Sequence, residues 1–394
     1  MSKADGKSAD FVIVGAGVIG TSLAFHLAKR RAGRIVVIDK EHAAKGGSGR
    51  SSALIRMHYT FPAEVQLAVK SLEYFEHWNE IVGEPGEFRK TGFVRLVPRQ
   101  EFDLLRANVA MLKAHGAKTE LIDCVELKKL EPDWDLSEEP GAAYEPESGY
   151  GDGALVAQDF ISAARDMGVE YQPKKRVTSL SVEGGRIRGV ITPDGEVHAS
   201  AVVLATGPWT TSLLQLIGIH VPIVSEFHQV AILRNAPGMK SAGCACIDSV
   251  HTVYFRSDSS DKTLVGDFYG DRQANIDPDH FPQRPFDEWI EDVLEKTCRR
   301  IPKLQNAEVM RGVTGIYDMT PDARPLLGRM KEIAGLYIAA GFSGTGFKIS
   351  PAIGLVMSEL LVDGAAKTID ISAFRPSRFA EGKPVKGQFE YKDD

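Results

Sequence analysis

Three glycines, Gly15, Gly17 and Gly20, and one acid, Asp39, have the types and the spacing needed to bind a dinucleotide. In this pattern the first glycine allows a tight turn, the second lets backbone N–H groups approach a pyrophosphate, and the third lets a helix pack closely on a strand. Asp39 follows Gly20 by 19 residues, where a carboxylate accepts hydrogen bonds from an adenosine ribose. The alternative is a plain βα turn, in which the glycines serve only the fold.

The elements around these residues are those that a dinucleotide site requires. Apolar runs at 11–14 and 35–38 predict two buried strands, and the stretch between them predicts an amphipathic helix with Leu23, Leu27 and Ala28 on one face. The N-terminus of that helix would present its partial positive charge to phosphates. This strand, turn, helix, strand unit predicts a Rossmann-type domain of the α/β class.

Three further stretches rich in small residues could lie against a ligand. Residues 46–52 follow the ribose acid directly and include Arg50, although a solvated loop is the alternative. A buried strand at 201–204 runs into a small-residue turn, at the end of the strand where α/β folds bind ligands. Residues 342–351 form a glycine-rich loop with one lysine, Lys348, before a helix predicted from Ala352, whose dipole favours negative charge nearby.

Composition and charge bound the remaining possibilities. A chain of 394 residues with 43% hydrophobic content predicts two domains, and a net charge of -6 gives no general footprint for nucleic acid or anionic membrane. Four scattered cysteines fit a reducing compartment, and no zinc-like spacing predicts a metal. With no signal peptide or membrane span apparent, we expect a cytoplasmic location. Residues 381–394 are polar and predict an exposed tail.

A change of character at 221–310 predicts a second domain. Strand-like runs at 228–233, 250–256 and 263–269, followed by a helix at about 285–298, indicate an antiparallel sheet with a covering helix. We therefore expect an α/β protein, α+β overall: a Rossmann-type nucleotide-binding domain with an inserted antiparallel-sheet substrate domain. The expected boundaries are 1–86, 146–222 and 311–380 for the first domain, and 87–145 and 223–310 for the second.

Five motifs in order resemble one family. GAGVIG with Asp39, SALIRMHY (52–59), LATGPW (204–209), IYDMTPDARPLLG (316–328) and AAGFSGTGFKISPAIG (339–354) are similar to the flavin-dependent amine oxidoreductases of the D-amino-acid oxidase superfamily. Within it, the chain looks most like sarcosine oxidase, its β-subunit relatives and dimethylglycine dehydrogenase. The resemblance spans residues 10 to about 375.

The resemblance implies a role for each matching residue. Arg56 and Lys348 would hold a substrate carboxylate over the flavin, Tyr317 matches the active-site tyrosine, and Tyr254 lies where a second aromatic of the substrate pocket is expected. The residues expected to contact FAD, from the motifs and the resemblance together, are Gly15, Gly17, Val18, Ile19, Gly20, Asp39, Lys40, Gly47, Ser48, Arg50, Ser51, Ser52, Val177, Ala205, Thr206, Gly207, Trp209, Gly315, Gly344, Thr345, Gly346, Phe347 and Lys348.

The departures from the family pattern matter as well. Gly315 stands where the family has its flavin-linking cysteine, so the FAD should be noncovalent unless His58 or another residue provides the link. Leu264 stands where the oxidases have an oxygen-activating lysine, with Lys262 two residues away, so a dehydrogenase is an alternative to an oxidase. Thr345 replaces a family histidine.

The sequence therefore predicts FAD-dependent oxidation of the C–N bond of a small secondary or N-substituted amino acid, by hydride transfer to flavin N5. The electron acceptor would be oxygen, a quinone or an electron-transfer protein. A 2-hydroxy-acid dehydrogenase is one alternative, which a histidine base such as His228 or His251 would favour. An FAD-binding subunit of a larger complex is another, and a hetero-oligomer is expected in that case.

Overall fold

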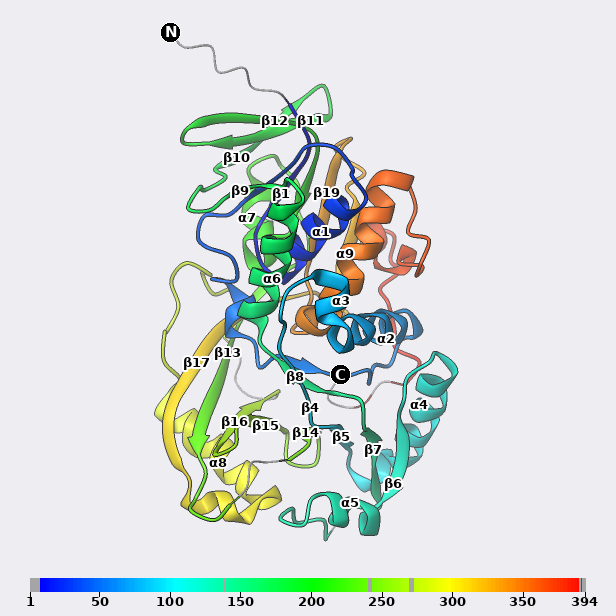
Figure 1. Cartoon of the computed structure of the whole chain (residues 1–394), viewed down its shortest axis with the longest axis vertical. Helices are drawn as coiled ribbons and strands as arrows, with labels where there is room; N and C mark the ends of the chain where they lie inside the picture. Colours follow the sequence, from blue (N-terminus) through cyan, green and yellow to red (C-terminus); the bar gives the residue numbers. More distant parts are fainter. Residues whose placement is uncertain (1–7, 138, 240–242, 269–272, 390, 392–394) are drawn as a thin grey trace.

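The structure is a computed structural model that describes residues 8–137, 139–239, 243–268, 273–389 and 391. It is elongated, and two eight-stranded sheets occupy its two halves, which are the upper and lower parts of Figure 1. This arrangement confirms the predicted mixed α/β class with a second, sheet-based region.

The first sheet has a parallel centre with antiparallel additions. Its parallel neighbours follow the order β9, β2, β1, β12, β19, with β11 and β10 antiparallel beside β12 and β18 antiparallel beside β19. The bounds are β1 (Ala9–Val14), β2 (Ile35–Ile38), β9 (Glu170–Gln172), β10 (Ser179–Glu183), β11 (Arg186–Thr192), β12 (Gly195–Leu204), β18 (Leu326–Arg329) and β19 (Leu336–Ala340).

Both faces of this sheet are buried, which explains the unbroken apolar runs of its strands. In β1, Ile13 packs into one core cluster, whereas Val12 and Val14 pack into the cluster on the other face. Helix α1 (Val18–Lys29) contacts both α6 (Gly153–Asp166) and α9 (Gly346–Asp363) and lies between them (Figure 1). The predicted unit of strand, turn, helix and strand is therefore confirmed as β1, α1 and β2.

Helix α9 begins at Gly346, six residues before the start predicted from sequence. Proline lacks an N–H and ordinarily breaks a helix, so a helix that contains Pro351 needs another donor for the carbonyl four residues earlier. Here the hydroxyl of Ser350 donates to the carbonyl of Phe347 at 2.8 Å, which satisfies the acceptor that Pro351 leaves without its usual donor. Lys348 consequently lies in the first turn of the helix and not in a loop.

The second sheet is antiparallel except for one pair, β5 with β14. Its order is β17, β13, β16, β15, β14, β5, β7, β6. The bounds are β5 (Phe93–Leu96), β6 (Glu120–Asp123), β7 (Gly141–Glu145), β13 (Val224–Arg234), β14 (Ala245–Asp248), β15 (Val253–Ser259), β16 (Lys262–Asp267) and β17 (Glu308–Met319). Residue 269, the last of a predicted strand, lies outside the described residues. Strand β17 crosses the boundary predicted at residue 310, so the domain division remains a proposal.

Helix α8 (Asp287–Arg300) packs on this second sheet through Val293, as the expected covering helix would. A small sheet of β3 (Leu54–Ile55), β8 (Gly149–Gly151) and β4 (Phe88–Lys90) lies between the two large ones. The remaining α-helices are α2 (Pro62–Glu76), α3 (Trp78–Val82), α4 (Phe102–Ala114), α5 (Cys124–Leu130) and α7 (Thr210–Gln215).

The C-terminal segment is exposed over residues 381–384, 386 and 388, as its polar sequence predicted, but Val385 and Tyr391 are buried. The backbone N–H of Val385 donates to Asp322 at 2.8 Å, and that of Gln388 donates to the carbonyl of Thr60 at 2.7 Å. Tyr391 is buried beside His58. The sequence did not reveal the two buried residues, because their partners are far away in the chain. Residues 390 and 392–394 lie outside the described part.

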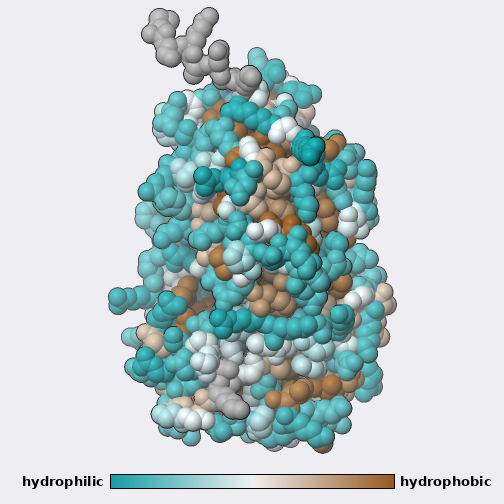
Figure 2. Space-filling view, in the orientation of Figure 1, coloured by the Kyte–Doolittle hydropathy of each residue, from teal (hydrophilic) through white to brown (hydrophobic). Residues whose placement is uncertain are grey.

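The surface agrees with the composition. The face shown in Figure 2 is mostly hydrophilic, with apolar residues visible mainly in its middle. Among the described residues, no helix combines the length and the apolar character that crossing a bilayer requires.

Candidate active site

The first of two adjoining cavities lies at the carboxyl ends of β1, β2 and β12. It has a volume of about 1320 Å³ and is lined by the glycine-rich turn after β1, the acid after β2 and the small-residue turn after β12. Ligands of open α/β sheets bind at such an edge. Its lining includes both Asp39 and Tyr317.

Backbone geometry explains the glycines of the turn. Gly15 has φ +105°, and a Cβ there would lie 2.3 Å from the carbonyl oxygen of Ala205. A Cβ on Gly20 would lie 1.9 Å from the carbonyl oxygen of Gly15, so Gly20 lets α1 pack on the turn. Ser48 accepts a hydrogen bond from the N–H of Val18 at 3.0 Å and so fixes the small-residue stretch beside the start of α1.

The carboxylate of Asp39 is held in place by the backbone. It accepts hydrogen bonds from the N–H groups of Ala16 (2.6 Å) and Glu41 (2.8 Å). Burial raises the pKa of this carboxyl above its ordinary value, while those two donors oppose the shift. The acid is thus oriented at the end of β2, where the ribose of a dinucleotide would lie.

Most of the residues predicted to contact the cofactor line this cavity. They are Gly15, Gly17, Val18, Ile19, Asp39, Lys40, Gly47, Ser48, Arg50, Ser51, Val177, Ala205, Thr206, Gly207, Trp209, Gly344, Gly346 and Phe347. Ser52, Thr345 and Lys348 line the neighbouring cavity instead. Gly20 packs behind the turn, and Gly315 faces the side chain of Arg50, so neither is among the lining residues.

A segment that the sequence did not reveal forms another wall of the first cavity. Residues 277–283, between β16 and α8, line it. Asp279 accepts a hydrogen bond from the indole of Trp209 at 3.0 Å and forms ion pairs with Lys40 and Arg176. The Lys40 ammonium lies 3.8 Å from the centre of the Trp209 ring. No motif marks this segment, because its partners are distant in sequence.

The second cavity, of about 560 Å³, brings together the residues predicted to bind substrate. Arg56, Lys348, Tyr254 and Tyr317 all line it. Tyr317 and Gly344 line both cavities, so the two spaces meet beside these residues. A cofactor in the first cavity could therefore reach a substrate in the second at this junction.

Arg56 and Lys348 make this cavity suitable for an anion. The Arg56 guanidinium donates to the carbonyl of His58 and lies 4.7 Å from the ring centre of Tyr59. The Lys348 ammonium donates to the carbonyl of Gly344 at 3.4 Å. Burial, helped by the positive charge of Arg56, lowers the pKa of Lys348 well below its ordinary value. A bound carboxylate would offset both effects.

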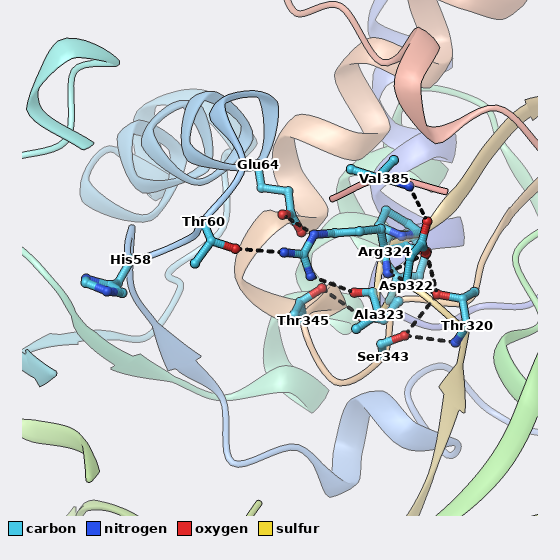
Figure 3. A network of polar contacts seen from close by, with 12 residues as sticks. His58, Thr60, Glu64, Thr320, Asp322, Ala323, Arg324, Ser343, Thr345 and Val385 are labelled. Atoms are coloured by element: carbon cyan, nitrogen blue, oxygen red, sulfur yellow. Dashed lines mark hydrogen bonds and ion pairs between the residues drawn. The ribbon is translucent and has the colours of Figure 1, made fainter. Parts of the chain in front are cut away.

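A polar network fixes the loop after β17 against this cavity (Figure 3). Arg324 forms an ion pair with the buried Glu64 at 2.6 Å and donates to the hydroxyl of Thr60 at 2.9 Å. Asp322 accepts two hydrogen bonds of 2.8 Å from Arg378. Because Asp322 also binds the N–H of Val385, the network attaches the C-terminal segment to the cavity wall.

Glu145, at the end of β7, holds the chain next to Arg56. Its carboxylate accepts hydrogen bonds from the N–H of Met57 (2.8 Å) and the hydroxyl of Ser148 (2.6 Å). Burial raises its pKa to about 7. Sequence reasoning missed this residue, since an isolated glutamate before a loop carries no signal.

Glu145 should make the stability of the protein depend on pH. Its folded-state pKa lies above the ordinary value of 4.5, so between these values the folded state binds a proton that the unfolded state has released. Its contribution to the free energy of unfolding therefore decreases as pH rises from about 4.5 to about 7. We expect thermal unfolding midpoints at pH 5, 6 and 7 to decline more in the wild type than in Glu145→Gln. Parallel declines would contradict the prediction.

The structure also locates the residues at which the chain departs from the expected pattern. Leu264 is buried in the core of the second sheet, and Lys262 pairs with Arg234 along the sheet. Among the described residues that line the second cavity, Lys348 is the only lysine. His58 lines the second cavity and not the first. No cluster of potential metal ligands occurs among the described residues.

The glycine turn, the acid after β2 and the adjoining cation-lined cavity are typical of an α/β protein that binds a dinucleotide beside a second, anionic ligand. Comparison with known proteins makes this specific. The family model "DAO: FAD dependent oxidoreductase" matches residues 10–360. The chain belongs to this family and is an FAD-dependent oxidoreductase.

Individual relatives extend over nearly the whole chain. Sarcosine oxidase subunit beta of Rhizobium meliloti (strain 1021) is 28% identical, over 96% of this chain and 91% of its own length. Mitochondrial dimethylglycine dehydrogenase of Mus musculus is 23% identical over 95% of this chain, which spans only 44% of that protein. The crystal structure of L-proline dehydrogenase from P. horikoshii has a TM-score of 0.89 and 28% identity, covering 96% of this chain and all of that one.

Asp279 joins the 277–283 segment to Lys40, Arg176 and Trp209, which also line the first cavity. We therefore expect it to slow the loss of FAD. Replacing it in Asp279→Asn removes the charge that pairs with Lys40 and Arg176, each partly exposed. Such pairs contribute roughly 0.2–1 kcal/mol each, so FAD should dissociate a few-fold faster at low salt. The difference should shrink at high salt, because ions screen exposed charges. The measurement is the rise of flavin fluorescence after dilution.

The control for this experiment is Glu170→Gln, which removes an exposed ion pair with Arg34, and neither of these residues lines the cavity. It should leave the rate of FAD release unchanged. Equal rates for Asp279→Asn and the wild type at low salt would refute the role of Asp279.

Proposed function

We propose that the protein oxidises the C–N bond of a small secondary or N-substituted amino acid, with noncovalently bound FAD as the hydride acceptor. The observation that carries this proposal is the pair Arg56 and Lys348, which line one cavity beside Tyr317 and Gly344, the residues shared with the cofactor cavity. The names of relatives, sarcosine oxidase subunit beta and L-proline dehydrogenase, support an amino-acid substrate with a secondary amine.

The residues of this site fit FAD, and their roles differ from that of the cofactor. The glycine turn, oriented Asp39 and small-residue stretch would hold the dinucleotide, and FAD supplies the hydride acceptor at N5 when bound. Arg56 and Lys348 would bind the substrate carboxylate and hold the carbon next to nitrogen at the junction of the cavities. The amine must be unprotonated for hydride to leave, and the imine product would hydrolyse in water.

One observation favours a second candidate, a 2-hydroxy-acid dehydrogenase. That reaction needs a base for the substrate hydroxyl, and His228 lines the second cavity, whereas His251 lines neither cavity. The name of the subunit-beta relative supports an assembly with other subunits, so a hetero-oligomer also belongs to the proposal. The scattered cysteines support a reducing, cytoplasmic location.

The test is anaerobic mixing of the FAD-bound protein with N-methyl, cyclic and D-amino acids and with 2-hydroxy acids, while the visible flavin absorbance is followed. Bleaching by an amino acid is expected. Bleaching by hydroxy acids alone would refute the amine proposal, and no bleaching by any compound would favour a noncatalytic subunit. The rate at which the flavin colour returns in air then separates an oxidase from a dehydrogenase. Position 264 is leucine and not the lysine of the oxidases, which favours a dehydrogenase.

A further inference from the structure

His228 and Glu226 form a pair that the proposed function leaves without a role. Both lie on β13 and, two residues apart, on the same face of the strand. Nε2 of His228 lies 3.1 Å from a carboxylate oxygen of Glu226, and the two side chains are 9% and 16% exposed. A carboxylate at this distance orients an imidazole and stabilises its charged form.

The pair lies next to the junction of the two cavities. The His228 ring stacks on that of Tyr317, with ring centres 3.7 Å apart and planes inclined by 23°. Tyr317 lines both cavities, and His228 lines the second. The imidazole is therefore close to the place where the reacting carbon and nitrogen of a substrate would meet the flavin.

We propose that His228, oriented by Glu226, removes the proton from the ammonium group of the bound amino acid. This inference rests on the proposed function. The N–H bond of the ammonium breaks, and its proton passes to a ring nitrogen of His228. The freed lone pair on nitrogen then forms the C=N bond while the hydride leaves carbon for FAD. The imidazolium proton is returned to solvent, so one proton and one hydride leave each substrate molecule.

The charges around His228 come from several elements. Glu226 lies on the same strand and Tyr317 on β17, while Tyr254 on β15 and Asp267 at the end of β16 line the same cavity. The cations of that cavity are Arg56, Arg95, Arg324 and Lys348. These cations disfavour an imidazolium, and the carboxylate of Glu226 offsets them. A neutral imidazole that accepts a proton only transiently is what a base at this position requires.

The experiment compares the pH dependence of anaerobic flavin reduction in the wild type, His228→Asn and Glu226→Gln, with the best amino-acid substrate. We expect His228→Asn to reduce the flavin roughly 100-fold more slowly near neutral pH, the lower range for losing a positioned base. Its rate should recover as pH approaches the pKa of the free amine, because the substrate then binds unprotonated. Glu226→Gln, which keeps the histidine, should shift the midpoint of the rate profile.

The controls separate this role from folding and from the function itself. His251→Asn, whose side chain lines neither cavity, should follow the wild-type profile. A His228→Asn profile parallel to that of the wild type at all pH values overturns the role of His228 while leaving the proposed function intact. If no amino acid bleaches the wild type, the proposed function fails first and this role with it. Bleaching by a hydroxy acid that His228→Asn loses without recovery at high pH would assign His228 to a hydroxyl and overturn the ammonium proposal.

Discussion

Arg56→Ala should lower kcat/KM for flavin reduction by an amino acid roughly 100- to 1000-fold. The guanidinium lines the second cavity near Lys348, and removing one member of a buried, hydrogen-bonded charge pair costs about 2–5 kcal/mol. The loss should appear in both kcat and KM, because the carboxylate contact also positions the reacting carbon. Stopped-flow reduction at several substrate concentrations measures both constants.

Two comparisons make this prediction specific to the carboxylate. Arg56→Lys keeps the charge but loses the planar fork, so its activity should fall between those of the wild type and the alanine variant. The amide of the substrate should react poorly with the wild type but lose little more in Arg56→Ala, because the contact is already missing. Equal losses for acid and amide would show that Arg56 acts on the structure and not on the carboxylate.

Local patterns explain why the nucleotide-binding unit could be predicted from sequence. The turn at Gly15, the helix after it and Asp39 lie within one short segment, so periodicity and spacing define them without knowledge of distant contacts. The start of α9 could not be read in the same way. Its first turns depend on a hydroxyl of Ser350 that substitutes for the missing N–H of Pro351. A proline rule applied to sequence alone has no access to that substitution.

The site could be predicted from sequence only through the motifs and the family resemblance. Arg56, Tyr317 and Lys348 come from three separate stretches, and the resemblance, not the spacing, brought them together. Asp279 and Glu145 act through partners far away in the chain, with Lys40 and Met57 respectively, and their neighbours in sequence give no sign of it. The pairing of such residues is decided by tertiary packing, which no local window contains.

Gly15→Ala should abolish the retention of FAD. The new Cβ would lie 2.3 Å from the carbonyl oxygen of Ala205, and the backbone at φ +105° is itself unfavourable for alanine by about 1–3 kcal/mol. Ala205 cannot move away easily, because its N–H donates to the carbonyl of Val14 at 2.8 Å next to the central strands. The turn must therefore open at the point where it would approach the pyrophosphate. The ratio of bound FAD to protein and the thermal unfolding midpoint measure the effect.

Gly184→Ala is the matched control, since it also places alanine at positive φ (+56°) but in a hairpin turn where a Cβ meets no atom within 4 Å. It should lose a little stability and keep its FAD. Any additional loss in Gly15→Ala then reports the clash with Ala205 together with the less favourable φ of +105°. If Gly15→Ala retained FAD as well as Gly184→Ala does, the close packing of the turn would not be what forms the cofactor site. The fit of the first cavity to a dinucleotide would then depend on Asp39 and the stretch around Ser48 alone.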